Sequence, residues 1–273
     1  MTTLDGATVL VTGASGGFGR QMMRQFLAAG SRMIVTDRDA AALAEAARTI
    51  QVEAGARGEI LAVPEADLSS RDGCERLYEK VRAVAVPDIL VNNAGIGMSG
   101  RIDRIPWQQW ETLMQVNLLS VMRLTALFLP SMLERDSGHV VNVSSIAGWV
   151  AAGGMSVYSA SKFGVRGFGD SLTRDLEDTG VRVTTVFPFF SRTPILDSIQ
   201  FGEDPPRKVP DDIVTEPADV VRAILRGIRE DREYVFPDPM ARRLHLLQRF
   251  LPRLVLWFGR RFEERTRPAG ESG

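Results

Sequence analysis

Short hydrophobic runs rich in β-branched residues alternate with longer amphipathic segments along the first 240 residues. The runs are typical of buried strands, which we place at 7–12, 31–36, 58–63, 88–93, 138–145, 181–188 and 233–236. Amphipathic helices are expected between them, at 18–29, 39–54, 70–85, 107–134, 156–179 and 217–230. This alternation requires right-handed crossovers. It predicts an α/β fold with a doubly wound parallel sheet of about seven strands and helices on both faces.

Two stretches depart from the alternating pattern. Residues 189–216 are rich in proline and charge, and we expect them to form a long substrate loop over the site. Residues 241–268 carry eight arginines and two glutamates, a local balance of +6, and include the apolar run LVLWF at 254–258. We therefore divide the chain into a single domain, 1–240, and a basic amphipathic, helical C-terminal extension, 241–273.

Composition narrows the class of protein. A formal net charge of −1 gives no overall reason to expect nucleic acid as a partner. The single cysteine, Cys74, cannot form an internal disulfide, which suits a reducing compartment. The polar start and the lack of an uncharged run of about 20 apolar residues argue against a signal peptide and a membrane span. We expect a cytoplasmic protein, and we predict no metal site.

The segment TGASGGFG, 12–19, follows the first predicted strand and opens the first helix. Gly13 allows a tight turn, Gly17 lets the backbone approach a pyrophosphate, and Gly19 allows close packing of the helix on the strand. The helix amino terminus offers free N–H groups and a partial positive charge to phosphates. We count Ser15 and Phe18 with these glycines as cofactor-binding residues.

Acidic residues follow the second and third strands. Asp37 could accept the ribose hydroxyls of NAD and repel the 2′-phosphate of NADP, whereas the adjacent Arg38 could attract that phosphate. A plain helix-capping role for Asp37 stays open. Asp67 could accept from the adenine amino group, with Leu68 beside the ring, or it could cap the helix from about 70.

Polar residues also follow the fourth strand and interrupt the long helix at 107–134. In NNAG, 92–95, the asparagines can bridge strand ends and the glycine suits a backbone close to a cofactor; we include Asn93, Ala94 and Gly95 in that site. Asn117 lies among apolar neighbours, and by itself it is interpreted as a core amide with satisfied hydrogen bonds.

The segment YSASK places Tyr158 and Lys162 on one face of a helix, because residues i and i+4 are neighbours there. The ammonium should lower the tyrosine pKa from about 10 and let it exchange a proton with an alcohol or carbonyl oxygen. Ser145, at the end of the fifth strand, could hydrogen-bond the same oxygen. Taken alone, the spacing would equally describe a pair on a helix surface.

Together these segments resemble the short-chain dehydrogenase/reductase family over about residues 5–190, and more loosely to about 237. TGASGGFG is similar to the family's TGxxxGxG segment, NNAG is complete, and YSASK matches YxxxK with a serine thirteen residues upstream. The resemblance implies a Rossmann-type fold and hydride exchange with a nicotinamide dinucleotide. It implies catalytic roles for Ser145, Tyr158, Lys162 and Asn117: Lys162 also binds the nicotinamide ribose, and Asn117 holds a water of the proton relay. It further suggests homodimers or homotetramers formed through the helices at 107–134 and 156–179.

One segment departs from the family pattern. Most relatives have PGxVxT or PGxIxT after the sixth strand, where this chain has PFFSRT, 188–193. Pro188 and Thr193 keep their places as expected cofactor contacts, but a phenylalanine replaces the glycine and a serine the aliphatic residue. An apolar wall for the substrate is one reading of the two phenylalanines, and ordinary core packing is the other. The residues expected in that wall are Ile96, Met98, Trp149, Met155, Phe189 and Phe190.

We therefore expect an NAD(H)-dependent oxidoreductase that interconverts a secondary alcohol and a ketone on a hydrophobic steroid, retinoid or hydroxyacyl-like substrate. An NADP(H)-dependent 3-oxoacyl or carbonyl reductase is the nearest alternative. A non-catalytic dinucleotide-sensing protein or a membrane-surface binding protein is the alternative from another class. The tail at 241–268 could cover the cleft, pack on another subunit or rest on a membrane, with Pro252 bending it.

Overall fold

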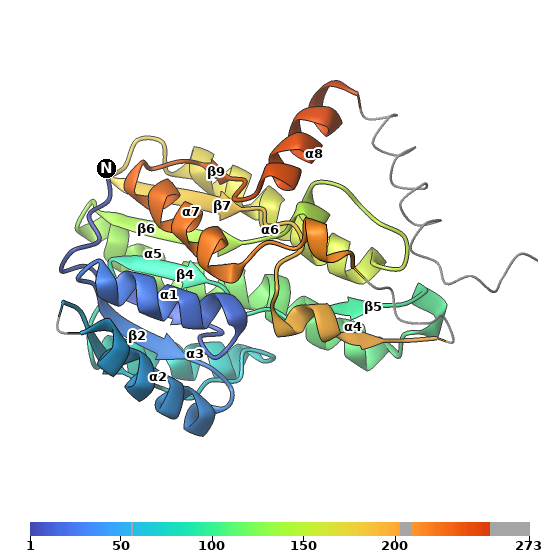
Figure 1. Ribbon diagram of the computed structural model, residues 1–273. Coiled ribbons are helices and arrows are strands. Elements are labelled where there is room, and N and C mark those ends of the chain that lie inside the picture. The colour runs from blue at the N-terminus through green and yellow to red at the C-terminus, as the bar shows by residue number, and fades with distance from the viewer. Residues whose placement is uncertain (56, 203–208, 252–273) are drawn as a thin grey trace, which may run out of the picture.

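The computed structural model describes residues 1–55, 57–202 and 209–251, and its centre is a seven-stranded parallel sheet (Figure 1). The strand order is β3-β2-β1-β4-β6-β7-β9. The strands are β1 (Thr8–Thr12), β2 (Arg32–Thr36), β3 (Glu59–Ala62), β4 (Ile89–Asn92), β6 (Gly138–Val143), β7 (Val181–Val186) and β9 (Tyr234–Val235). The predicted doubly wound parallel sheet is confirmed.

Helices cover both faces of this sheet. One face carries α1 (Gly17–Ala28), α2 (Ala40–Ala54) and α7 (Pro217–Arg229); the other carries α3 (Arg71–Arg82), α5 (Ser120–Glu134) and α6 (Ser156–Asp175). Each face has its own apolar core, with Phe26 fully buried in one and Phe128 almost so in the other. Truncating either ring to alanine would cost about 3–5 kcal/mol of stability.

The helix predicted at 107–134 is interrupted. A π-helical stretch, Gln115–Leu119, separates α4 (Trp107–Met114) from α5. Such a stretch inserts an extra residue into the helical turn and redirects the side chains in it. The whole segment is long and apolar enough to cross a membrane by length and composition, but its buried residues, such as Leu124, belong to the core beneath the sheet.

Several short elements surround the carboxyl ends of the strands. β5 (Met98–Ser99) pairs in parallel with β8 (Ile199–Gln200), which ties the predicted loop at 189–216 to the segment after β4. Short 3-10 helices lie at Ile102–Arg104, Ile146–Gly148, Pro194–Asp197 and Asp211–Ile213. None of these elements has a hydrophobic period long enough to be recognised from sequence.

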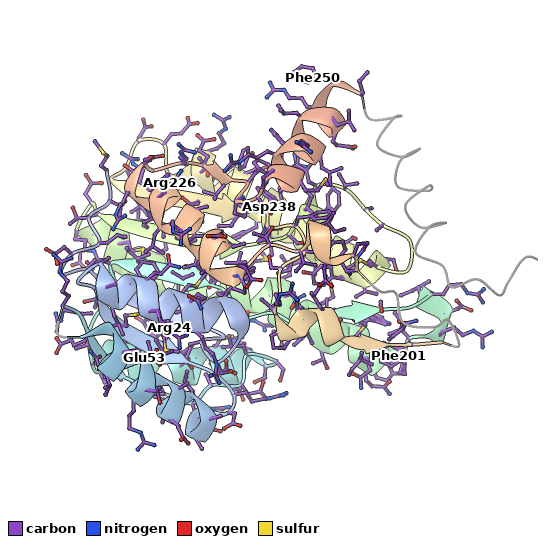
Figure 2. All side chains as sticks on the ribbon, viewed as in Figure 1. Arg24, Glu53, Phe201, Arg226, Asp238 and Phe250 are labelled. Atoms are coloured by element: carbon purple, nitrogen blue, oxygen red, sulfur yellow. The ribbon has the colours of Figure 1, made fainter. Side chains whose placement is uncertain are left out.

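The C-terminal extension begins as a helix two residues earlier than expected. α8 (Pro239–Phe250) is capped by Asp238, whose side chain accepts a hydrogen bond from the backbone N–H of Ala241 at 2.7 Å. Figure 2 labels Asp238 at the base of α8 and Phe250 at its far end. The LVLWF run and the predicted bend at Pro252 lie outside the described residues.

Candidate active site

A large cleft of about 2110 Å³ runs along the carboxyl ends of the strands, on both sides of the point between β1 and β4 where strand order reverses. Parallel α/β sheets bind ligands at this position. Most residues singled out from the sequence line it: Gly13, Ser15, Gly17, Phe18, Asp37, Arg38, Asp67, Leu68, Asn93, Ala94, Gly95, Ile96, Met98, Ser145, Met155, Tyr158, Lys162, Pro188, Phe189, Phe190 and Thr193. Three do not line it, namely Gly19, Asn117 and Trp149.

The glycine turn has the geometry of a phosphate cradle. Gly13 has φ +66°, and a Cβ there would lie 2.7 Å from the Cα of Ala94. Gly16 is the N-cap of α1 and leaves the first turn of the helix without a side-chain cap. A Cβ on Gly17 would lie 2.6 Å from Thr193, and one on Gly19 would overlap the Gly13 carbonyl. Gly19 thus serves helix packing, and the open helix start fits a dinucleotide pyrophosphate.

A hydrogen-bond network joins the ends of β1 and β4. The hydroxyl of Thr12 accepts from the N–H groups of Asn93 and Ala94, both at 3.0 Å. The Asn93 amide donates in return to the carbonyls of Thr12 at 2.9 Å and Gly13 at 3.0 Å. Asn93 therefore bridges two strand ends, as the sequence predicts. The matching role of Thr12 was not foreseen, because nothing in the sequence near Thr12 identifies its partners.

Asp37 lies at the end of β2 with its carboxylate tied to the glycine turn. One oxygen accepts from the Ser15 N–H at 3.0 Å and the Ser15 hydroxyl at 2.6 Å, and the other accepts from the Arg38 N–H at 2.7 Å. The N-cap of α2 is Asp39, which accepts from the Ala42 N–H, so the capping alternative for Asp37 is wrong. A carboxylate in this place fits the ribose of a dinucleotide.

Asp67 likewise is not a helix cap. Its carboxylate accepts from the Ser69 N–H at 2.9 Å, and the hydrogen bonds with Ser69 hold its pKa below the ordinary value. The N-cap of α3 is Ser70, which accepts from the Gly73 N–H at 3.1 Å. Asp67 and the buried Leu68 are left facing the cleft, in a position suited to adenine.

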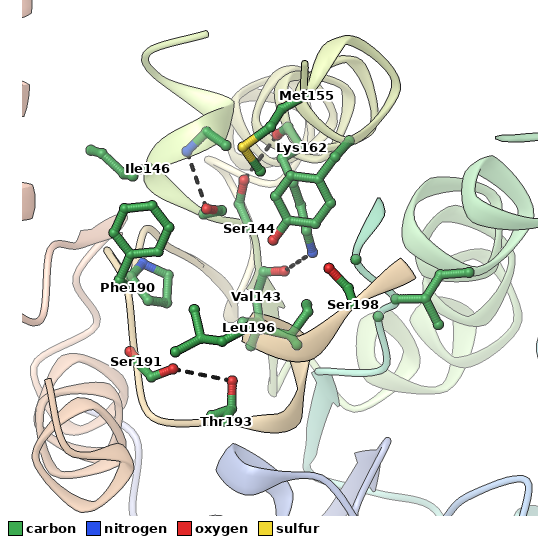
Figure 3. A pocket seen from close by; sticks show the side chains of 18 of the residues that line it. Val143, Ser144, Ile146, Met155, Lys162, Phe190, Ser191, Thr193, Leu196 and Ser198 are labelled. Atoms are coloured by element: carbon green, nitrogen blue, oxygen red, sulfur yellow. Dashed lines mark hydrogen bonds between the residues drawn. The ribbon is translucent and has the colours of Figure 1, made fainter. Parts of the chain in front are cut away.

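Tyr158 and Lys162 lie one turn apart on α6, and Ser145 faces them from the end of β6. Tyr158 is 8 % exposed and shares a hydrogen bond with the Ser145 side chain. The Lys162 amine donates to the Val143 carbonyl at 2.9 Å, as Figure 3 shows, and lies 5.8 Å from the centre of the Tyr158 ring. Ser145 itself lies two residues beyond β6, where it caps the 3-10 helix Ile146–Gly148.

The pKa of Tyr158 differs from the sequence-based expectation. Burial raises it above the ordinary value, and the hydrogen bond with Ser145 lowers it by less. Burial also lowers the pKa of Lys162 to about 8. The predicted decrease at Tyr158 is therefore wrong, because removal of water from the phenolate outweighs the stabilising contacts. Tyr158 is protonated at neutral pH, which suits a proton donor.

Asn117 is held in the core behind this group. Its side-chain oxygen accepts from the Ile96 N–H at 2.8 Å, and its amide donates to the Ile96 carbonyl at 2.9 Å and to Ser161 at 3.3 Å. This geometry matches the core amide inferred from the residues alone. Gly95 brings it close to the site, since a Cβ there would lie 3.5 Å from Asn117 and 3.6 Å from the Lys162 amine. The relay role implied by the family resemblance stays a prediction.

Trp149 was predicted in the substrate wall but does not line the cleft. Its ring packs edge-on against Phe187 and Phe236 at 5.3 and 5.5 Å, and the Arg166 guanidinium lies 3.4 Å from the ring centre. Ile146, at the start of the short 3-10 helix before it, lines the cleft, whereas Trp149 lies in the aromatic cluster with Phe187 and does not. The other five predicted wall residues do line the cleft.

One face of α8 forms a further part of the wall, which agrees with the cleft cover given above as one role for the tail. Residues 240, 243, 244, 247 and 250 share one helix face, and Leu246 and Leu251 lie beside it along the cleft. Asp238 fixes the start of α8 by accepting from the Phe189 N–H at 2.9 Å. The helical spacing of these residues was a usable signal, but only the three-dimensional arrangement shows what the face covers.

Comparison with known proteins gives consistent matches. A family model described as short chain dehydrogenase matches residues 7–204. The ketoacyl reductase HetN of Nostoc sp. is 36% identical over 189 residues, which are 69% of this chain and 64% of that protein. A short-chain dehydrogenase from Sphingobium yanoikuyae, solved in complex with NADPH, has a TM-score of 0.76 at 26% identity and covers 98% of both chains. One from Burkholderia phymatum, solved with NAD, has a TM-score of 0.78 at 24% identity over 100% of both chains.

Proposed function

The chain belongs to the short-chain dehydrogenase family, and from that premise we propose that it interconverts a secondary alcohol and a ketone on a hydrophobic substrate with NAD(H). The observation that carries the proposal is the juxtaposition of Ser145, Tyr158 and Lys162 in the same cleft as the glycine turn and Asp37. Membership of the family makes the protein an oxidoreductase that uses NAD or NADP. The choice between the two, and the substrate, are the parts we propose.

The residues of this chain would orient the substrate and carry the proton. In reduction, the hydroxyls of Ser145 and Tyr158 hold the carbonyl oxygen, and Tyr158 gives its proton to that oxygen as the alcohol forms. A dinucleotide held at the glycine turn and Asp37 would supply the hydride for reduction of the carbonyl carbon, or accept it in oxidation. The positive charge of Lys162 stabilises the Tyr158 phenolate that remains after this proton transfer. Burial of Tyr158 and Lys162 strengthens this electrostatic interaction.

Asp37 supports NAD over NADP. Its carboxylate faces the cleft at the end of β2, where it would accept ribose hydroxyls and repel a 2′-phosphate. The second candidate is an NADP(H)-dependent ketoacyl reductase. It is favoured by Arg38, which lines the same part of the cleft, by the similarity to the ketoacyl reductase HetN, and by the NADPH in the Sphingobium structure.

The composition of the substrate half of the cleft supports an apolar substrate. Ile96, Met98, Met155, Phe189 and Phe190 line it. Burying apolar substrate surface against such side chains is favourable by about 25 cal/mol per Å². Steroids, retinoids and long-chain hydroxyacyl compounds offer the surface that this wall requires.

Self-association is proposed through the helices at 107–134 and 156–175. Met122 and Leu133 on α5 and Phe163 on α6 are large apolar side chains between 39 and 40% exposed. Helices 107–134 and 156–175 are therefore the expected contact surface of a homodimer or homotetramer. Light scattering of the full chain and of a variant with Phe163→Glu would test this, with a smaller assembly expected for the variant.

Assays of a panel of ketones and alcohols test the proposed activity, with turnover measured as the change in NADH or NADPH absorbance. We expect turnover of hydrophobic ketones with NADH and little with NADPH. Turnover restricted to small polyols or sugars would overturn the substrate class. A preference for NADPH would favour the second candidate. The same panel run with Tyr158→Phe provides the control for turnover that does not pass through the site.

A further inference from the structure

We infer that the cleft takes an amphipathic substrate with an apolar chain and an anionic group, and that Arg243 on α8 binds the anion. The inference rests on the proposed function, since it names the substrate class of that same cleft. It starts from the charge distribution among the residues that line the cleft. Among the described residues of the lining, Asp37 and Asp67 are the acidic ones, and both lie at the dinucleotide end.

The substrate half of the lining holds two arginines, Arg101 and Arg243. Arg101 is paired with Asp103 through two hydrogen bonds, at 2.6 and 2.7 Å. The side chain of Arg243 has no hydrogen bond or ion pair with any residue of 1–55, 57–202 or 209–251. Lys162, which also lines the cleft, donates to the Val143 carbonyl, so the Arg243 guanidinium is the cation there that no described residue hydrogen-bonds or pairs with. A guanidinium binds carboxylates and phosphates with paired hydrogen bonds.

The other arginines of α8 do not face the cleft. Arg242 donates to the carbonyl of Phe236 at 2.9 Å, and Arg249 lines a separate small pocket beside Trp149. Arg243 instead lies on the apolar face of the helix, with Leu244 and Leu247 as neighbours along the cleft. Arg243 is exposed, and an exposed cation beside apolar side chains matches a ligand that is itself apolar with one charged group.

The base of α8 holds Arg243 in place relative to the reacting groups. Asp238, 1% exposed, binds both the start of α8 and the backbone of Phe189, and Ala241 is fully buried against the aromatic cluster around Trp149. Arg243 is the fifth residue of this anchored helix, at the start of its second turn. The wall continues from Met240 to Phe250 for about 15 Å along the helix. An anion near the strand ends and a chain lying along α8 would use both features.

Binding of ten-carbon probes to the NADH-loaded full-length protein tests the assignment. Calorimetry would compare decanoate, decyl phosphate and decanol on the wild type, Arg243→Gln, Arg243→Lys and the matched control Arg249→Gln. We expect the wild type and the control to bind at least one anion about 10- to 100-fold more tightly than decanol. Arg243→Gln should lose this preference, and Arg243→Lys should retain part of it. The tighter of the two anions identifies the group as a carboxylate or a phosphate.

Equal binding of anions and decanol to the wild type, or an unchanged preference in Arg243→Gln, would overturn the inference. So would a loss of NADH affinity in that variant, because it would place Arg243 on the cofactor. The probes need no turnover, so the outcome is separate from that of the proposed activity. Ketone turnover without an anion preference refutes only the role of Arg243, and an anion preference without turnover refutes only the proposed reaction.

Discussion

Replacing Asp37 by serine should change the cofactor preference. The carboxylate would repel a 2′-phosphate about 4 Å away by about 4 kcal/mol at an effective dielectric constant of 20, and partial exposure and salt reduce this to about 1–2 kcal/mol. Loss of charge-assisted hydrogen bonds to the ribose of NAD adds about 1.5–3 kcal/mol. The ratio of NADH to NADPH affinity should therefore fall by about 3 kcal/mol, which is roughly a hundredfold.

Fluorescence titration with NADH and NADPH measures this ratio without turnover. Asp37→Ser also removes the acceptor of two hydrogen bonds from Ser15, so both affinities could fall through a loosened glycine turn. Only the ratio therefore tests the reasoning. Asp39→Ser is the matched control, because it removes a charge two residues away while serine still caps α2. An unchanged ratio in Asp37→Ser, or the same change in Asp39→Ser, would refute the specificity assigned to Asp37.

Three further predictions concern the turn, the proton donor and stability. Gly13→Ala should weaken NADH binding and destabilise the fold by at least about 1 kcal/mol, because φ is +66° and the new Cβ meets the backbone just after β4. Gly6→Ala is the control: at φ +73° it has the same backbone strain, but its Cβ lies in open space and NADH affinity should be unchanged. Ketone reduction needs protonated Tyr158 and charged Lys162, so its rate should stay level through neutral pH and fall above about 8; a reduction rate that rises above pH 8 would contradict this. Burial lowers the pKa of His139 to about 4, so as the pH falls below 6.5 the unfolded chain protonates this imidazole while the folded chain does not. The free energy of unfolding should therefore decrease by up to about 3 kcal/mol between pH 6.5 and 4. Urea unfolding measures it, and a free energy of unfolding that stays constant over that range would contradict the prediction.

Local patterns predicted the sheet, its helices and most of the cofactor end. Strand runs and i,i+4 spacing depend only on nearby residues, so Tyr158 and Lys162 were placed on one face before any fold was known. The roles of Asp37 and Asp67 were harder to predict from sequence, since a helix cap and a ligand contact use the same residue types. Hydrogen bonds observed at Asp39 and Ser70 exclude the helix cap in both cases, and the ligand contacts stay predictions.

The remaining features depend on contacts between distant segments. The π-helical stretch holds Asn117 against Ile96, twenty-one residues away along the chain, and no local propensity encodes that pair. Trp149 was misassigned because its direction depends on a three-residue helix. The pKa of Tyr158 depends on burial by the whole site, so the neighbouring lysine alone gave the wrong direction. The position of α8 over the cleft likewise follows from its anchor at Phe189.

The proton-carrying role of Tyr158 is the central claim, and paired turnover and NADH titration of Tyr158→Phe test it most directly. Tyr78→Phe, on α3 and away from the lining of the cleft, is the matched control and should behave as the wild type. The account predicts that Tyr158→Phe loses at least about a hundredfold in turnover while its NADH affinity stays within about twofold. Turnover close to the wild-type rate with NADH affinity intact would contradict it.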